Sequence, residues 1–485
     1  MNDNLPKLKD LTVDHSLCLR DVMEVIGRNG QGVSFIIDGD ILCGIITDGD
    51  IRRALLNGHS INTKIEKIIR SEYTSLPFNS SLKAIQEALE NFKIVPIIGN
   101  NGTLVDYASL NRYHQIPLTQ PVFDGSELEY VTDCIKSGWI SSQGSYVVKF
   151  ENEFGKYVEN SNCLAVSNGT VALHLALATL DIGPGDEVIV PNLTFAAPVN
   201  AILYQGATPV LCEVSKRTLT LDMNILRRLI NSKTRAIVPV HLYGYAVEMD
   251  DLVKLANQND IYIVEDCAEA FGTRYKERHV GNFGDIGTFS FFGNKTITTG
   301  EGGMMVFKDL EMMKKAKILR DHGMNPVKRY WHDVVGFNYR ITNIQSAIGL
   351  GQIEKAKTLV DAKRSIANSY IKYLHDLKEV ELPNESVDVF NSYWLFTIVL
   401  DSKYREFRNS IIEKLALRGI EARPIFYPLH QMPPYKRFAK KDLTYNISSE
   451  LSECGISLPS AITLSDEDIA LVCKAFKEII VTIDI

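Results

Sequence analysis

Between residues 186 and 307 the chain alternates short, continuously apolar segments with longer segments of helical periodicity. Six apolar segments are strand candidates: residues 186–191, 208–214, 234–240, 261–266, 287–292 and 302–307. Strands without a polar face are typical of parallel sheets that helices cover on both sides. The alternation therefore predicts an α/β fold with a mostly parallel central sheet. After about residue 365 the pattern becomes mixed, which indicates a smaller C-terminal α+β domain.

Composition excludes several classes of protein. The 485 residues include 52 basic and 59 acidic ones, for a net charge of −7, which argues against a dedicated nucleic-acid or anionic-membrane binder. No apolar run reaches the roughly 18 residues of a membrane span. The eight cysteines contain no CxxC pair, so we expect no metal site of that kind. Scattered cysteines and the absence of an apolar signal core favour a cytoplasmic location.

Two similar segments open the chain. Residues 32–58 predict strand, tight turn, strand and helix, and residues 92–110 repeat the strand–turn–strand part. Because neither copy can bury its own sheet, we expect the two to pack on each other. A proline-containing segment, residues 112–121, indicates a linker. We therefore expect three domains, at residues 1–115, 116–365 and 366–485.

Three segments of the central region carry groups that suit a phosphorylated aldehyde. Gly169 and Thr170 begin an apolar helix, whose first N–H groups can bind phosphate. Asp266 ends a buried strand, where α/β proteins place ligands. Lys295 lies with Ser290 near a glycine-rich turn, where burial can activate its amine. A helix cap or a solvated lysine would explain each segment alone, but together and in this order they match what pyridoxal phosphate requires.

Several longer motifs follow one another in a recognisable order. They include SGWISSQG (137–144), VEDCAEAFG (264–272), SFFGNKTITTGEGGM (290–304) and GFNYRITNIQSAIGL (336–350). With these motifs, residues from about 117 to 485 resemble the DegT/DnrJ/EryC1/StrS family of sugar-nucleotide aminotransferases. The resemblance implies a fold-type-I aminotransferase with pyridoxal 5′-phosphate as cofactor and a role in surface polysaccharide biosynthesis. L-Glutamate would be the amino donor, 2-oxoglutarate the by-product and a nucleotide-linked keto-deoxysugar the acceptor.

The resemblance also implies roles for individual residues. Lys295 would be the Schiff-base lysine, and Asp266 would pair with the pyridine nitrogen. The other cofactor contacts would be Gly169, Thr170 and Ser290 at the phosphate, Phe195 on the ring, Glu269 near the ring hydroxyl, and Asn338 reaching the phosphate of the neighbouring subunit. The last contact implies a homodimer or a higher homo-oligomer. His241, Arg423 and His430 are candidates for sugar or nucleotide contacts.

The sequence leaves alternatives open for both the acceptor sugar and the activity. GDP-4-keto-6-deoxymannose is the expected acceptor, and another nucleotide-linked keto sugar aminated at C3 or C4 is the alternative. The dehydratase branch of the family has His in place of the lysine, so Lys295 argues against it. The chain could also be a nucleotide sensor whose aminotransferase-like domain has no activity. Cystathionine β-synthase joins the same cofactor to similar N-terminal modules, but its motif order does not match.

The N-terminal repeat resembles a pair of CBS domains, the arrangement called a Bateman module. In GIITDGD (44–50), Thr47 and Asp50 would contact the phosphate and ribose of an adenine nucleotide. The second copy departs from this pattern, because Ser109 stands for the threonine and Arg112 falls near the aspartate position. The resemblance thus implies at most one nucleotide site, and a purely structural or dimerising module is the alternative.

Overall fold

The computed structural model describes residues 6–69, 72–78, 80, 82–99, 101–109 and 116–483. The chain forms two compact units, one of residues 1–116 with the segment 415–420 and one of residues 117–414 with 421–485. Arg112 and the first part of the expected linker lie outside the described residues. Among the residues described, no helix is long and apolar enough to cross a membrane.

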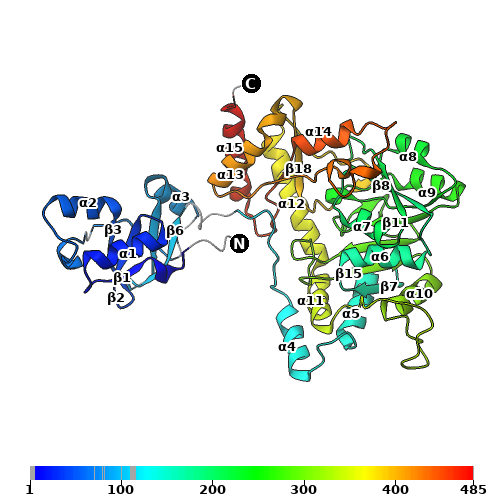
Figure 1. The fold of residues 1–485 in the computed structure, drawn as a ribbon, viewed down its shortest axis with the longest axis horizontal. Helices are drawn as coiled ribbons and strands as arrows, with labels where there is room; N and C mark the ends of the chain where they lie inside the picture. The colour runs from blue at the N-terminus through cyan, green and yellow to red at the C-terminus, as the bar shows by residue number, and fades with distance from the viewer. Residues whose placement is uncertain are drawn as a thin grey trace. The chain divides into compact units, whose positions relative to one another are not determined.

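The first unit is a structural repeat. Each copy has a three-stranded sheet, in which the first strand runs parallel to the second and the second antiparallel to the third (Figure 1). The first copy consists of β1 (Thr12–Asp14), α1 (Leu19–Asn29), β2 (Val33–Asp38), β3 (Ile41–Thr47) and α2 (Asp48–Leu56). The second copy consists of β4 (Leu76–Pro77), α3 (Leu82–Asn91), β5 (Ile94–Ile98) and β6 (Leu104–Ser109).

The two copies pack on each other through one apolar cluster. Phe35 of β2 and Leu42 of β3 share this cluster with Leu104 and Tyr107 of β6. The rings of Phe35 and Tyr107 lie 6.2 Å apart. Backbone hydrogen bonds join the strand ends, including one of 2.8 Å from Leu104 N to the Asp40 carbonyl. Each copy thus covers a sheet that the other would leave open to water.

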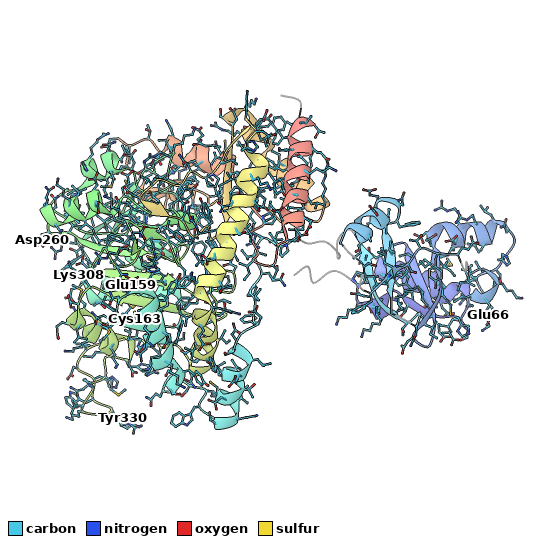
Figure 2. The ribbon with its side chains drawn as sticks, turned by 180° about the vertical axis from the view of Figure 1, so that it is seen from behind. Glu66, Glu159, Cys163, Asp260, Lys308 and Tyr330 are labelled. Atoms are coloured by element: carbon cyan, nitrogen blue, oxygen red, sulfur yellow. The ribbon has the colours of Figure 1, made fainter. Side chains whose placement is uncertain are left out.

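A seven-stranded sheet forms the centre of the second unit (Figure 1). Its strands lie in the order β7, β15, β14, β11, β10, β8, β9; β15 is antiparallel to both neighbours and the other pairs are parallel. The bounds are β7 (Cys163–Val166), β8 (Glu187–Pro191), β9 (Thr208–Cys212), β10 (Thr234–Ile237), β11 (Tyr262–Asp266), β14 (Ile286–Ser290) and β15 (Gly303–Phe307). All six predicted strands are present. Only β7, which carries Cys163 (Figure 2), is a strand of this sheet that the sequence pattern missed.

Alternate residues of each central strand enter different apolar clusters. In β15, Met304 and Val306 belong to one cluster, and Met305 and Phe307 to the other. Helices α6, α7 and α10 supply the second cluster, and α5, α8, α9, α11 and α12 the first. The helix bounds are α4 (Glu127–Ser137), α5 (Ser145–Val158), α6 (Gly169–Thr179), α7 (Ala197–Tyr204), α8 (Met223–Leu229), α9 (Met249–Gln258), α10 (Leu310–Arg320) and α11 (Asn343–Glu354). The sheet is therefore the middle of three layers, which explains why its strands read as continuously apolar.

The C-terminal part of this unit builds a smaller antiparallel sheet, in the order β16, β18, β20, β19. The bounds are β16 (Val380–Glu381), β18 (Phe396–Leu400), β19 (Arg423–Pro424) and β20 (Gly455–Leu458), with helices α12 (Ala356–Leu374), α13 (Arg408–Leu417), α14 (Asn446–Cys454) and α15 (Asp466–Val481). A third, minor sheet joins β12 (Arg274–Tyr275), β13 (Arg278–His279) and β17 (Val389–Phe390). Residue 365, the expected domain boundary, lies inside the continuous helix α12.

One buried carboxylate holds the end of β11 in place. Glu265 is fully buried, and its carboxylate accepts hydrogen bonds from three backbone N–H groups, those of Gly281, Phe283 and Gly284, at 2.6–2.8 Å. His241 Nε2 lies 3.1 Å from Glu265 Oε2. Charge-assisted hydrogen bonds of this kind are about twice as strong as neutral ones. The loop 281–284 is thereby tied to the strand that carries Asp266.

Replacing Glu265 with alanine should destabilise the second unit strongly. The change leaves three buried N–H groups without their acceptor, and losing one partner of a buried charged network costs about 3–5 kcal/mol. The melting temperature of the protein should fall by several degrees in a thermal unfolding experiment. Glu311→Ala is the matched control, since Glu311 is exposed and pairs with Lys314 at the surface of α10. Equal melting temperatures for the two variants would contradict this role of Glu265.

Candidate active site

A cavity of about 580 Å³ lies at the carboxyl ends of the parallel strands. Its wall combines the first residues of α6, the ends of β11 and β14, the turn that follows β14, and segments of the smaller sheet. The lining includes the predicted residues Gly169, Thr170, Phe195, Asp266, Glu269, Ser290, Lys295 and Arg423. Eight of the eleven residues predicted for this unit thus surround a single cavity, although they come from segments far apart in the sequence.

Three ionisable side chains meet at the base of this cavity. Lys295 Nζ lies 3.5 Å from Glu269 Oε1, and all three side chains are largely buried. Burial lowers the pKa of the Lys295 amine, while the nearby charges of Glu269 and Asp266 oppose that shift. Burial also raises the pKa of Asp266 and of Glu269. A lysine whose pKa is lowered more readily supplies the neutral amine that acts as a nucleophile.

Backbone geometry fixes where the carboxylates stand. Asp266 is the last residue of β11, and its Oδ1 accepts a 3.0 Å hydrogen bond from Ala268 N. Glu269 follows within the same turn, and its Oε2 accepts a 3.1 Å hydrogen bond from Tyr243 N. Tyr243 has a positive φ of 53°, a backbone conformation that residues other than glycine rarely adopt. That backbone conformation turns the Tyr243 N–H toward Glu269.

The first turn of α6 presents backbone N–H groups to the cavity. The Asn168 side chain caps the helix by accepting a hydrogen bond from Val171 N at 2.9 Å. In the described part of the chain, no acceptor is bonded to the N–H groups of Gly169 and Thr170. A Cβ on Gly169 would come within 2.7 Å of Ser290 Cβ, so glycine alone lets the helix approach the end of β14 this closely. These donors and the Ser290 hydroxyl form a site for an anion such as phosphate.

An aromatic row that sequence reasoning missed forms another part of the wall. Trp394 and Phe426 both stack on Tyr243, with interplanar angles of 8° and 18°. Phe426 in turn lies 5.8 Å from the ring of Phe195. Trp394 also faces Lys295, whose Nζ lies 3.7 Å from the centre of its ring. The spacing of these aromatic residues in the chain gives no sign that their rings stack.

Three predicted residues do not line the cavity. His241 is fully buried; its Nδ1 accepts a hydrogen bond from Val247 N, and its Nε2 faces Glu265. His430 bonds to the Asn192 side chain at 2.8 Å and stacks on Tyr445. Both histidines therefore take part in internal packing rather than facing the cavity.

Asn338, the third of these residues, is exposed on the segment that follows α10. The carbonyl of its neighbour Tyr339 accepts a hydrogen bond from Ser167 N, next to the α6 turn. A loop at residues 325–335 precedes Asn338 and carries Tyr330 away from the helices (Figure 2). The Asn338 side chain thus lies at the surface of the chain.

In the first unit, Thr47 and Asp50 form the N-terminal cap of α2. The Asp50 carboxylate accepts hydrogen bonds from Thr47 N at 3.0 Å and Thr47 Oγ1 at 2.6 Å, and Asp50 N donates to Thr47 Oγ1 at 3.3 Å. Arg53 Nη2 also lies 2.6 Å from Asp50 Oδ1. Thr47 and Asp50 thus form a capping box, which explains the presence of both residues without a ligand. Ser109 ends β6 at the corresponding place of the second copy.

The cavity fits the chemical needs of pyridoxal phosphate. The cofactor requires an amine for its aldehyde, an anion for its pyridine nitrogen and N–H donors for its phosphate. Lys295, Asp266 and the first turn of α6 present these three groups to the same space. The close approach of Gly169 to Ser290 leaves no room for a side chain between the phosphate donors.

Comparison with known proteins supports the same assignment. A model of the DegT/DnrJ/EryC1/StrS aminotransferase family matches residues 121–477. The GDP-perosamine synthase of Escherichia coli O157:H7 is 47% identical over 365 residues, which cover 75% of this chain and 98% of that protein. The enzyme of the same name from Vibrio cholerae is 44% identical over 362 residues, with coverages of 75% and 98%.

Solved structures agree with these sequence matches. Spr1654 from Streptococcus pneumoniae in its PLP-form aligns with a TM-score of 0.72 at 29% identity, covering 76% of this chain and 98% of that one. DesV from S. venezuelae, solved with a ketimine intermediate, aligns with a TM-score of 0.70 at 32% identity, with coverages of 74% and 95%. The predicted fold type and cofactor are confirmed, and this chain belongs to the DegT/DnrJ/EryC1/StrS aminotransferase family.

Proposed function

We propose that this protein transfers the amino group of glutamate to GDP-4-keto-6-deoxymannose and so forms GDP-perosamine. The observation that carries the proposal is the cavity in which Lys295, Asp266 and the α6 N-terminus converge. Identities of 43–47% to three proteins named GDP-perosamine synthase support the choice of sugar. A lysine at position 295, rather than histidine, supports transamination over the dehydratase reaction.

Each residue of the cavity has a distinct task in this reaction. Bound pyridoxal phosphate supplies an electron sink that makes the α-proton of the amino acid acidic. Lys295 Nζ would take that proton from Cα of the amino acid and deliver it to C4′ of the cofactor, because burial leaves its amine able to act as a base. Asp266 would hold a proton on the pyridine nitrogen through its negative charge. Gly169, Thr170 and Ser290 would bind the phosphate and set the orientation of the ring.

The remaining lining residues suit the sugar nucleotide. Arg423 lies in the cavity wall and pairs with Glu421 at 2.7 Å, with more than half of its side chain still exposed. Guanidinium groups bind phosphate oxygens in a fixed two-donor geometry, so Arg423 is the residue that we assign to the diphosphate. Phe195, by contrast, is more than half exposed at the cavity wall and is available to stack on the ring of the cofactor.

Loss of Lys295 should abolish the reaction. With glutamate and GDP-4-keto-6-deoxymannose, the full-length protein should form GDP-perosamine and 2-oxoglutarate, identified by mass and NMR. Lys295→Ala should form neither product, and borohydride should no longer attach the cofactor to the chain. Lys308→Ala is the control, since Lys308 lies on the surface (Figure 2) and pairs with Asp285. An active alanine variant at position 295 would disprove the mechanism, and amination of a different keto sugar in the same panel would disprove only the substrate.

We also propose that two subunits share each active site. Asn338 is exposed and lines no part of its own cavity, as expected for a residue that reaches a neighbour. The preceding loop exposes Val327, Tyr330 and Val335 by 76–93%, a concentration of apolar surface that suits burial in an interface.

Mixing two inactive variants tests this arrangement. In a heterodimer of Lys295→Ala and Asn338→Ala subunits, one site keeps both Lys295 and a partner asparagine. Random exchange makes half of the dimers mixed, so activity should return to about one quarter of the wild-type value. Each variant mixed with itself is the control. Demonstrated subunit exchange without any recovered activity would exclude the shared site.

The first unit is proposed to be a regulatory nucleotide-binding module of the CBS type. Its two-copy architecture supports this assignment, while the hydrogen bonds between Thr47 and Asp50 support the structural alternative. A ligand can change the activity only through different affinities for two conformations of the protein. All the cavity residues named above lie beyond residue 117, so the unit is not needed for the chemistry itself.

Calorimetry with AMP, ADP and ATP on the full chain distinguishes these two roles. A regulatory module should bind one nucleotide per chain, and Asp50→Asn should weaken that binding at least tenfold. Asp48→Asn is the matched control, because Asp48 stands in the same helical turn but is exposed. The absence of binding heat for every nucleotide would favour a purely structural module.

A further inference from the structure

The catalytic lysine has an aromatic neighbour that no part of the mechanism above uses. Lys295 Nζ lies 3.7 Å from the ring centre of Trp394, about as close as its 3.5 Å approach to Glu269 Oε1. A cation above a tryptophan ring is attracted by the negative face of the ring, most strongly where water is excluded. Trp394 is 5% exposed and lies in the cavity wall. The ring therefore bounds the space in which the Lys295 amine can move.

Trp394 is itself held at three points. Its Nε1 donates a 2.8 Å hydrogen bond to the carbonyl of Asn294, the residue directly before Lys295. Its ring stacks on Tyr243, whose backbone N–H binds Glu269. Its own carbonyl accepts a 3.0 Å hydrogen bond from Lys363 Nζ. These contacts link the tryptophan to both the lysine turn and the carboxylate that faces the lysine.

Lys363 is the least expected member of this group. It lies in α12, is 4% exposed, and also donates to the carbonyl of Ser460 at 2.5 Å. In the described ranges, no carboxylate pairs with its amine. Burial lowers the pKa of Lys363 to about 7. A buried amine without an acid is costly for folding, and it is tolerated only where its hydrogen bonds are well satisfied. Here these hydrogen bonds join Trp394, two residues before β18, to Ser460, which follows β20.

We propose that Trp394, anchored by Lys363, is a positioning residue that holds the Lys295 amine toward the cofactor site. The inference rests on the proposed role of Lys295 and adds a residue to it. The indole bond to Asn294 fixes the turn, and the ring face limits the rotamers of the lysine side chain. The same ring keeps water from the amine. In this way the smaller sheet, through the residues that precede β18, controls the geometry of a lysine on the large sheet.

The capture of pyridoxal phosphate by full-length apoenzyme measures both effects. The amine of Lys295 joins the aldehyde carbon through a C=N bond and one water leaves, so the rate can be followed by absorbance without turnover. Plotted against pH, the rate constant gives a midpoint, set by the pKa of the amine, and a plateau, set by its placement. Glu269 and Asp266 face the amine from the β11 side, and Trp394 faces it from the smaller sheet. All three residues therefore affect the midpoint.

Trp394→Leu should lower the plateau rate about tenfold and shift the midpoint down by about 0.5–1 pH unit, because the ring no longer favours the charged amine. Trp394→Phe keeps a ring but loses the Asn294 bond, so it should lower the plateau with a smaller shift of the midpoint. Lys363→Met should lower the plateau without moving the midpoint downward. Tyr373→Leu is the matched control, since Lys372 Nζ lies 5.3 Å from the centre of that ring and neither residue lines the cavity, and it should leave both values unchanged.

The outcomes separate this inference from the proposed function. If wild-type protein captures no cofactor at Lys295, the proposed function fails. If wild type captures it and Trp394→Leu shows the same plateau and midpoint, the positioning role is wrong. If circular dichroism shows that the leucine variant does not fold, the Trp394→Phe variant tests the positioning role instead. A wild-type plateau for the phenylalanine variant would then overturn the proposal.

Discussion

A lysine buried between two buried carboxylates is the constraint on which the second unit depends. Lys295, Asp266 and Glu269 are all removed from water, where charged groups are costly unless they are paired and hydrogen-bonded. The surrounding structure supplies that compensation through the N–H groups of Ala268 and Tyr243 and the ring of Trp394. The cofactor, with its cationic ring nitrogen, its aldehyde and its phosphate, complements the charges that remain.

Two adjacent residues at the end of β11 have different surroundings. Side chains of consecutive strand residues point in opposite directions, so Glu265 and Asp266 face different surroundings. Glu265 is surrounded by backbone donors from the loop 281–284, whereas Asp266 lines the cavity. His241, a sequence candidate for the substrate, belongs with Glu265. The same strand end thus contains a carboxylate that holds the fold and a neighbouring carboxylate that lines the cavity.

The aromatic row extends this arrangement to the smaller sheet. Phe426 N donates to the Tyr243 hydroxyl, and Trp394 joins the row from the residues before β18. The cavity is consequently closed by segments that follow residue 390, although Asp266, Glu269 and Lys295 come from earlier in the chain. The position of the smaller sheet relative to the large one therefore determines the shape of the site. The boundary expected near residue 365 falls within the continuous helix α12 rather than in a linker.

The sequence by itself determined the layered fold, the repeat of the first unit and the three groups that the cofactor needs. Each of these depends on local signals: apolar runs, turn residues, or motifs such as VEDCAEAFG that keep their residues together. It missed β7, because four residues between a helix and a glycine turn carry too short a pattern. Only the tertiary structure decided that Trp394 covers Lys295, that Lys363 lies under Trp394, and that His241 and His430 turn inward. Those contacts join residues separated by 24 to 238 positions, and their formation depends on how whole layers pack rather than on any local preference.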